Sequence, residues 1–531
     1  MKKSTLLFVI FFIFFGRALC GQAAVFNVTD VTQFQNALTT AGSNGEDDNI
    51  NIAAGTYTVM STLTYPAAVT ENFILAIEGA GADETILDGG NTNRILLINI
   101  THLIDDSNAH ISIKGLTFQK GSSGDGGGLY TRTNSADLKL EDSKFNRNSS
   151  TSYGGGAYLS SSGGTATITN NSFSNNSADH RGGGTYVNGM KTTTLTANTF
   201  SNNSADLGVG GGVYADASYG TLILTNNTFS ENASTGSAGG AYLDGSPHGV
   251  ITATSNTFTS NSSGAWAGGA YVTGDLETVS FTNNTLSNNS ASHLGGGLYF
   301  APGRGTGTAA SNTFIDNSAD LGGGIYVDGH TSTTTLTNNV FNKNTSAQHG
   351  SGVYAYLNQF GTLDITNNSL SVNSTAGDGG GLYIFLRESN NTVNIYNNII
   401  WANTAIGIAG DLYVNDDGDN SGTGGTVNLF NNDYSTFDIF DGDNLHHADN
   451  INEDPLLTAN FHLQANSPCI DNGDNAAPSL PATDFEGDNR IMDGDGDSIA
   501  TVDIGADEYV KKYSPWILFT PAILSGAQQN N

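Results

Sequence analysis

Apolar and polar residues alternate in short runs along most of this chain, and the runs recur at a nearly constant spacing. Thr165-Ala-Thr-Ile-Thr169 and Thr362-Leu-Asp-Ile-Thr366 are examples in which every second residue is apolar. This period of two indicates strands with one buried face, and no segment between residues 118 and 415 sustains the 3.6-residue period of a helix. The pattern therefore predicts an array of short β-strands.

Each repeat of the array contains a run of small residues, mostly glycine, that leads into an apolar residue and a tyrosine. Residues 311–327 are representative, with glycines at 322–324 followed by Ile325 and Tyr326. Successive tyrosines are 27 to 30 residues apart: Tyr130, Tyr158, Tyr186, Tyr214, Tyr242, Tyr271, Tyr299, Tyr326, Tyr354, Tyr383 and Tyr413. Self-similarity at such a period is typical of a solenoid in which each repeat forms one coil.

Asparagines occupy two further columns of the repeat. The first lies three residues after an apolar anchor, usually phenylalanine: Asn148, Asn176, Asn203, Asn232, Asn261, Asn289, Asn317, Asn344, Asn373 and Asn403. The second lies two residues before that anchor: Asn171, Asn198, Asn227, Asn256, Asn284, Asn312, Asn339, Asn368 and Asn398. With coils about 4.8 Å apart, each amide can donate to the next carbonyl, and asparagine also tolerates the left-handed backbone of a tight corner. We therefore expect an all-β fold, a single-stranded, right-handed parallel β-helix.

The residues on both sides of each tyrosine are mostly apolar, as Ile325 and Val327 are around Tyr326. Because alternate residues of a strand face opposite ways, these neighbours form the core face and the tyrosines point outward. A column of rings on an outer face can bind a sugar polymer or a partner protein. The alternative is that the stacked rings stabilise the sheet and lie partly under loops.

The start of the chain has the features of an export signal. Lys2 and Lys3 precede an apolar run over residues 6–15, and small residues follow, which predicts a secretory signal peptide at 1–24 rather than a membrane span. Lipidation at Cys20 is an alternative way of processing it. We expect an extracellular protein, either secreted or on the surface of a bacterium.

After the signal, Asp30 and Gln33 have the spacing of a helix cap, and Val31, Phe34 and Leu38 then share one face. This short helix is expected to cover the open end of the first coil. The predicted divisions are a signal peptide at 1–24, a cap and irregular coils at 25–117, regular repeats at 118–415, an acidic region at 416–510 and a tail at 511–531.

The composition, with 68 glycines and only 13% charged residues, agrees with a β-solenoid. Removing Lys2, Lys3 and Arg17 with the signal would take the formal net charge from −32 to −35. Such a chain is expected to repel nucleic acids and anionic membranes and to attract divalent cations. Cys469 then has no disulfide partner, so packing and hydrogen bonds must hold the fold.

Catalytic chemistry would need clustered residues that the array does not supply in sequence. A polysaccharide lyase uses a basic residue beside acidic metal ligands, and a glycoside hydrolase uses paired carboxylates. The basic residues are scattered instead: Lys139, Lys144, Arg147, Arg181, Lys191, Arg304, Lys343 and Arg387. Acidic residues and histidines recur in the variable corner before the glycines, either as solvated groups or as cation ligands: Asp125, Asp179, His180, Asp206, His293, Asp320, His349 and Asp378.

Past Tyr413 the charge balance shifts, since residues 411–510 hold 22 acidic residues and one basic residue, Arg490. Alternating carboxylates in a glycine-rich loop suit calcium, a hard ion that takes six to eight oxygen ligands. We predict a calcium site formed by four aspartates, the alternative being a solvated acidic turn: Asp493, Asp495, Asp497 and Asp503. No other cofactor is expected.

Two sets of residues resemble known families. Gly239-Gly-Ala-Tyr242 and Phe173-Ser-Asn-Asn176 resemble the repeats of the polymorphic outer membrane proteins, whose passenger regions are β-helical adhesins, although the tyrosine after the glycines departs from that pattern. Segments 467–473, 484–490 and 503–509 are similar to the choice-of-anchor Q type ending of secreted bacterial β-helix proteins. In that family the segment beyond these motifs can carry an anchor, but residues 514–524 are too few to span a bilayer.

These resemblances imply a non-catalytic, adhesive β-helix that binds an extracellular polysaccharide or a surface protein. We expect no nucleic acid as a partner and no membrane span in the mature chain. The alternative is a carbohydrate-active enzyme, a polysaccharide lyase or a glycoside hydrolase, because pectate-lyase-like β-helices include such enzymes. The sequence leaves the ligand, the oligomeric state and the mode of surface retention open.

Overall fold

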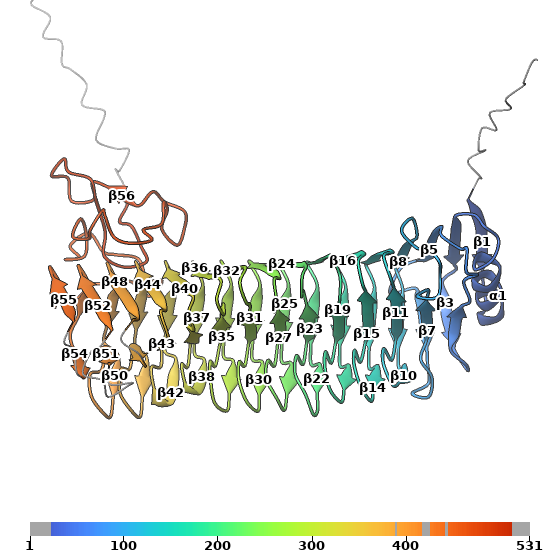
Figure 1. Ribbon diagram of the computed structural model, residues 1–531, viewed down its shortest axis with the longest axis horizontal. Helices are drawn as coiled ribbons and strands as arrows, with labels where there is room; N and C mark the ends of the chain where they lie inside the picture. The colour runs from blue at the N-terminus through green and yellow to red at the C-terminus, as the bar shows by residue number, and fades with distance from the viewer. Residues whose placement is uncertain (1–22, 388–389, 417–424, 441–443, 512–531) are drawn as a thin grey trace, which may run out of the picture.

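The computed structural model describes residues 23–387, 390–416, 425–440 and 444–511, and within these ranges the chain winds as an elongated parallel β-helix (Figure 1). Most of the predicted signal peptide, Cys20 and the apolar segment 514–524 lie outside the described residues. In the described part of the chain, no helix combines the length and hydrophobicity of a membrane span.

Four parallel sheets run along the helix axis. Sheet A has 16 strands, from β1 (Ala24–Val28) to β55 (Leu445–Ala448), sheet B has 14, from β3 (Gly55–Thr58) to β53 (Asp433–Tyr434), sheet C has 14, from β4 (Leu63–Tyr65) to β54 (Phe437–Phe440), and sheet D has 11, from β10 (Ser122–Ser123) to β50 (Thr404–Ala405). Each strand pairs with the strands of the preceding and following coils, so the predicted all-β parallel architecture is confirmed.

One coil passes through all four sheets in a fixed order. The representative coil consists of β36 (Thr306–Ala310) in sheet A, β37 (Thr313–Ile315) in sheet B, β38 (Ser318–Leu321) in sheet D and β39 (Ile325–Asp328) in sheet C. The register places identical residues of neighbouring coils side by side. Tyr326 pairs with Tyr299 and Tyr354, and Phe314 pairs with Phe341. The sequence period is therefore the coil period.

The interior of the coil is apolar and closely stacked. Phenylalanines of sheet B lie ring on ring, with centroids 4.7 to 4.9 Å apart from Phe145 to Phe258, and their exposed fractions are 0%. Leucine, isoleucine and valine of sheets A and C complete this core. Stacking at the strand spacing lets successive coils bury the same ring without a gap, and Leu286, Leu370 and Ile400 take its place in the other coils.

The two predicted asparagine columns are buried ladders. Each Nδ2 donates to the Oδ1 of the next coil, for example Asn289 to Asn317 at 3.0 Å and Asn284 to Asn312 at 3.1 Å. The backbone N–H of the same residue donates to the same oxygen, and Nδ2 also reaches a carbonyl of the preceding coil, as from Asn289 to Phe258. The ladders thus satisfy polar groups at the corners where the sheet hydrogen bonds are interrupted.

The first ladder ends on a carboxylate rather than on another amide. Asn403 donates its backbone N–H and its Nδ2 to Asp411 Oδ1, both at 3.0 Å, while Asp411 Oδ2 accepts from Ser435. The second ladder continues beyond the predicted column through Asn432 to Asn450.

The left-handed backbone predicted for the ladder asparagines belongs instead to the residue before each of them. Asn288 and Asn283 have φ of 56°, and non-glycine residues such as Val372 occupy the same place in other coils. The side chain of each ladder asparagine points inward. The left-handed residue just before it turns the backbone so that the side chain can do so.

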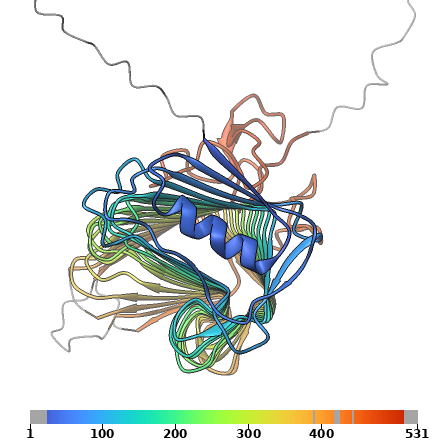
Figure 2. The ribbon, with the colours of Figure 1, turned by 90° about the vertical axis from the view of Figure 1, so that its right-hand side faces the viewer.

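The N-terminal cap is confirmed as α1 (Val31–Ala41). Asp30 accepts from the backbone N–H of Gln33 at 2.8 Å, and the Gln33 side chain accepts from the backbone N–H of Thr29 at 3.0 Å. Phe34 and Leu38 are fully buried, and the helix lies across the open end of the coil (Figure 2). It shields the core of the first coil from water.

Candidate functional site

Residues 449–511 form the terminal region, which packs on the outside of the last coils (Figure 1). It contains two short antiparallel strands, β56 (Ile491–Met492) and β57 (Thr501–Val502). Left-handed asparagines at the corner between sheets A and B hold it. Asn338 donates to the carbonyl of Thr483 at 2.7 Å, and Asn367 donates to that of Asp503 at 2.8 Å.

An apolar seam lies under the same contact. Ile399 of the coil packs with Leu463, Cys469 and Ile504 of the terminal region, and all four are buried. Cys469 is a free thiol that contacts the buried carboxylate of Asp433, with Sγ 3.4 Å from Oδ2. Burial raises the pKa of Asp433 to about 7 and raises that of the thiol as well. This thiol is therefore neutral and enclosed, unlike a reactive cysteine.

Arg490, the single basic residue of the predicted acidic region, is 1% exposed. Its guanidinium donates to the carbonyls of Ala506 and Asp507 at 2.7 and 3.0 Å and lies 3.5 Å from Glu508. Burial raises the pKa values of Glu508 and Asp503; the Asp503 carboxylate raises the pKa of Glu508 further, and the Asp471 carboxylate raises that of Asp503. One buried cation thus faces more carboxylates than it can neutralise.

The four aspartates of the predicted calcium site fall into different surroundings. Asp493 and Asp495 are exposed, and with Asp471 they bring carboxylate oxygens within 4.8 Å of one another. Asp497 accepts from the N–H of Ile499, outside this group. Asp503 is 1% exposed and accepts from the N–H groups of Asp471 and Tyr509. Asp471, 22 positions upstream of Asp493, is the member of this group that spacing alone did not identify.

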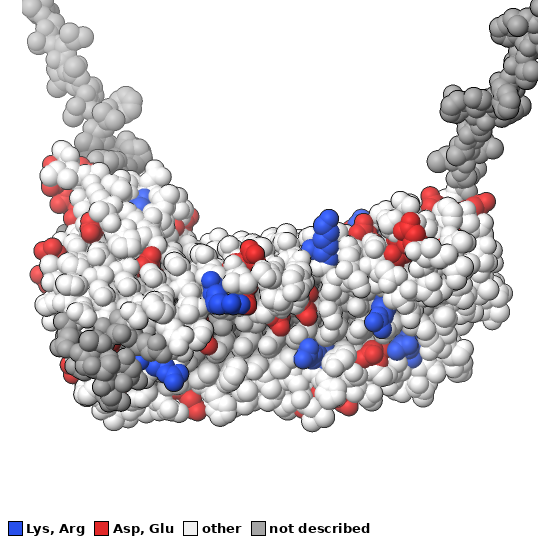
Figure 3. Space-filling view, in the orientation of Figure 1, with Lys and Arg blue, Asp and Glu red and all other residues white. Residues whose placement is uncertain are grey.

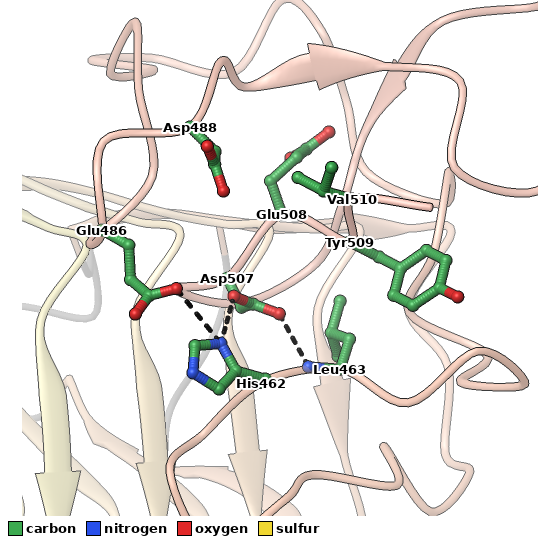
Figure 4. Close-up of a pocket in the computed structure, with 8 residues that line it drawn as sticks. All are labelled: His462, Leu463, Glu486, Asp488, Asp507, Glu508, Tyr509 and Val510. Atoms are coloured by element: carbon green, nitrogen blue, oxygen red, sulfur yellow. Dashed lines mark hydrogen bonds and ion pairs between the residues drawn. The ribbon is translucent and has the colours of Figure 1, made fainter. Parts of the chain in front are cut away.

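A second group of side chains whose nitrogen and oxygen atoms lie close together borders a cavity of about 470 Å³ in the terminal region (Figure 4). The His462 Nδ1 lies 3.0 Å from Asp507 Oδ1 and 3.5 Å from Glu486 Oε2. The cavity is also lined by Asp488 and Glu508. The three side chains come from segments far apart in the sequence, and only the fold brings them together.

Backbone hydrogen bonds fix the loops that carry these side chains. Asp484, 3% exposed, accepts through Oδ1 from the N–H groups of Glu486, Gly487 and Asp488 at 2.8 to 2.9 Å. Asp507 Oδ2 accepts from the N–H of Leu463 at 2.7 Å, so Oδ1 is the oxygen turned toward His462. The hydrogen bond to Asp507 raises the pKa of His462, and burial raises that of Asp507.

Charge is distributed unevenly over the surface. Figure 3 shows acidic side chains gathered on the terminal region, whereas the face over the coils is mostly uncharged. Of the corner residues considered as cation ligands, His293 lies 3.5 Å from Asp320 and His349 lies 3.4 Å from Asp378, each pair joining neighbouring coils. These pairs follow the coil spacing and are not gathered into one site.

The tyrosine column lies outside the core, as alternation predicts, but most of its rings are not exposed. Between Tyr186 and Tyr413 most members are 4 to 9% exposed, so the interpretation of an open aromatic stripe is wrong and the alternative, rings under loops, is correct. Corner side chains cover them: Trp266 stacks on Tyr299 at 5.4 Å, and Arg181 lies 4.8 Å over Tyr214. The rings stabilise sheet C rather than meeting a ligand.

Comparisons with known proteins place the chain by its fold. No curated protein matches the sequence significantly. Among solved structures, a mannuronic acid specific polysaccharide family 6 lyase from human gut microbiota has 11% identity and a TM-score of 0.27, covering 80% of this chain and 85% of that chain. The PL6 family alginate lyase AlyGC has 12% identity and a TM-score of 0.20, covering 81% and 79%. Such low TM-scores support no conclusion about the chemistry of this chain.

The family comparison is more extensive. The model of the right handed beta helix region matches residues 101–285 and 267–400, which together make up more than half of the chain. The matched residues are the coils described above, and the match agrees with the predicted hand of the solenoid. The chain therefore belongs to the right-handed β-helix family.

Proposed function

We propose that this protein is a secreted or cell-surface bacterial β-helix that binds an extracellular polysaccharide or a surface protein without catalysing a reaction. One observation carries the proposal. The corner between sheets D and C exposes a large apolar side chain in some of the coils, namely Leu207 at 72%, Trp266 at 39% and Ile406 at 84%. Exposed apolar side chains along the same edge of the helix favour a binding surface.

The repeated residues of each coil support a scaffolding role. The asparagine ladders, the phenylalanine stack and the tyrosine stack all make contacts within the molecule. The variable corner residues are then the part of each coil that is free to meet a partner. A net charge of −32 argues against nucleic acid as that partner.

A binding assay with a product assay tests this proposal. The secreted chain is incubated with a panel of polysaccharides, and both retention on each polymer and release of new ends are measured. Retention that is lost in a Leu207→Ser, Trp266→Ser double variant, with no new reducing ends or unsaturated products, is expected. A control Thr285→Ser variant, exposed on sheet B, should bind normally. Product formation by the wild type would overturn the proposal.

The alternative is a carbohydrate-active enzyme, and the cavity at His462 is the observation that favours it. It places a histidine beside the carboxylates of Glu486 and Asp507, with the buried Glu508 nearby. Such groups can transfer protons if a sugar enters the cavity. Products formed by the wild type and abolished in Glu486→Gln would establish the enzyme.

We further propose that calcium binds to the loop that carries Asp493, Asp495 and Asp497, with Asp471 as an additional ligand and Asp503 holding the backbone of Asp471 in place. The support is the approach of three carboxylates to within 4.8 Å, since like charges so close repel unless a cation offsets them. Calcium at a hundred times its Kd would add about 2.7 kcal/mol to the stability of the folded region.

Limited proteolysis tests the calcium proposal. Chelation with EGTA should speed cleavage of the terminal region while the coils persist, and an Asp493→Asn, Asp495→Asn double variant should remove the difference. Asp449→Asn, an exposed aspartate outside the group, is the matched control. Equal cleavage with and without EGTA in the wild type would leave these aspartates as solvated turn residues.

A further inference from the structure

We propose that His462, Glu486 and Asp507 bind a divalent transition metal of the zinc class at the edge of the terminal cavity. This site goes beyond the proposed binding function and is separate from the calcium loop. One ligand atom from each side chain, a ring nitrogen and two carboxylate oxygens, lies within 4.8 Å of the other two. A nitrogen ligand distinguishes this group from the all-oxygen group at Asp471.

The two distances from the His462 ring nitrogen are close to those between ligands around one ion. Zinc lies roughly 2.0 to 2.2 Å from nitrogen and oxygen ligands, so neighbouring ligands of a tetrahedral site are roughly 3.3 to 3.6 Å apart. The His462 Nδ1 is 3.0 Å from Asp507 Oδ1 and 3.5 Å from Glu486 Oε2. A metal can therefore replace the proton that His462 shares with Asp507, and the side chains need only small shifts.

The surrounding contacts orient the ligands in advance. Leu463 N–H holds Asp507 Oδ2, which leaves Oδ1 directed at the imidazole, and Asp484 gathers three N–H groups of the loop that carries Glu486. The ring of Phe485 lies 5.6 Å from that of His462. Contacts of this kind to the groups behind a metal's ligands raise affinity by fixing the ligand geometry.

Charge and ligand type indicate which ion fits. Asp488 and Glu508 line the same cavity, while Arg490 is buried and engaged with the carbonyls of Ala506 and Asp507. The site therefore attracts a divalent cation. Imidazole favours zinc and its neighbours over calcium, which prefers oxygen ligands throughout. Three protein ligands also leave a coordination position facing the cavity of about 470 Å³.

Calorimetric titration of the full secreted chain with zinc, in excess calcium to fill the oxygen-only group, tests the proposal. The wild type should bind one equivalent, and His462→Ala should lower the affinity by about 100-fold or more. Glu486→Gln, at a more exposed ligand, should weaken binding too, so a folding defect at His462 cannot explain both results. His447→Ala, an exposed histidine on β55, and Asp493→Asn should bind zinc as the wild type does.

Cobalt supplies a second readout. Bound at this site, it should give visible absorption bands that disappear in His462→Ala and persist in His447→Ala. The proposal is overturned if the wild type binds no stoichiometric zinc, or if His462→Ala and Glu486→Gln both retain wild-type affinity. Because neither measurement involves a polysaccharide, the result is independent of the proposed binding function.

Discussion

The guanidinium of Arg490 donates a 2.6 Å hydrogen bond from Nη2 to the side-chain oxygen of Asn338, 152 residues earlier in the chain. The bond joins the terminal region to the corner of a coil, and both partners are buried. The same guanidinium faces Glu508 and the carbonyls of Ala506 and Asp507. Arg490 is thus one of the residues through which the terminal region is held to the array.

Arg490→Met should release the terminal region from the coils. The variant keeps the length of the side chain but leaves Glu508 and Asp503 without a cation, and breaking a buried pair in this way costs about 3 to 5 kcal/mol. Faster proteolysis of residues beyond 449, with the coils resistant, is expected. Arg304→Met, which removes an exposed pair with Asp275, should change little. Equal cleavage in the two variants would contradict this role for Arg490.

Asn289→Ala should break the first ladder in the middle. It removes the oxygen that accepts from the backbone N–H and from Nδ2 of Asn261, so the buried N–H loses its acceptor and Nδ2 keeps only its bond to the carbonyl of Phe229. The expected cost is at least about 2 kcal/mol. Chemical denaturation and hydrogen exchange in the adjoining coils measure it. Asn288→Gly, at the exposed left-handed residue next door, is the control and should be nearly neutral.

Gly296→Ala should prevent neighbouring coils from closing. A Cβ at this position would lie 2.4 Å from the carbonyl oxygen of Gly323 and 2.5 Å from that of Ser318. Because both obstacles are backbone atoms, the coil spacing itself would have to change. A large fall in soluble yield and melting temperature is expected. At Gly124 an added Cβ meets nothing within 4 Å, so Gly124→Ala should be tolerated, and equal melting of the two variants would argue against the clash.

The buried carboxyl of Asp433 should make the seam near Cys469 sensitive to pH. Burial raises its pKa to about 7, above that of an exposed aspartate near 3.9. The folded state therefore binds more protons than the unfolded state between these values, and the free energy of unfolding falls as pH rises through that window. Above about pH 7 this dependence ends, because both states are then ionised.

Thiol labelling of Cys469 with a disulfide reagent measures that change locally, because the thiol is fully buried in the folded region. The opening that permits labelling should become more frequent from pH 5 to pH 7 in the wild type, after correction for the reagent's own pH dependence. Asp433→Asn should flatten the profile and slow labelling at neutral pH. A variant with the wild-type profile would show that another group causes the dependence.

The local sequence pattern was sufficient to predict the strands and ladders of the coil but not the side chains that cover its tyrosines. The period of two gave the direction of each tyrosine, and the spacing of asparagines gave the ladders. The cover over Tyr299 comes from Trp266, on a corner one coil earlier, and no rule of alternation applies to such corners. The left-handed backbone was predicted at the ladder asparagines but is found at the residue before each of them, because sequence spacing does not reveal backbone dihedrals.

The terminal region was harder to predict, because its contacts have no period. Charge composition located an acidic region, and the alternation of aspartates singled out Asp493 and Asp495. Asp471 and His462 lie upstream of their partners, and only the fold of the terminal region brings them together. Arg490 stands out in the sequence as the single basic residue of an acidic region. Its partner Asn338 could not be predicted, because it lies in the repeat array.

The end of the first ladder at Asp411 has an electrostatic consequence. Every amide in that ladder points its N–H toward the C-terminal coil, so the side-chain dipoles align and polarise one another along the axis. The row behaves as one long dipole whose positive pole lies where the last donor, Asn403, emerges. Asp411 places a carboxylate at that pole, as an acidic residue does at the N-terminus of an α-helix. A carboxylate also has no N–H to pass on, so it both compensates the accumulated dipole and fixes the length of the row.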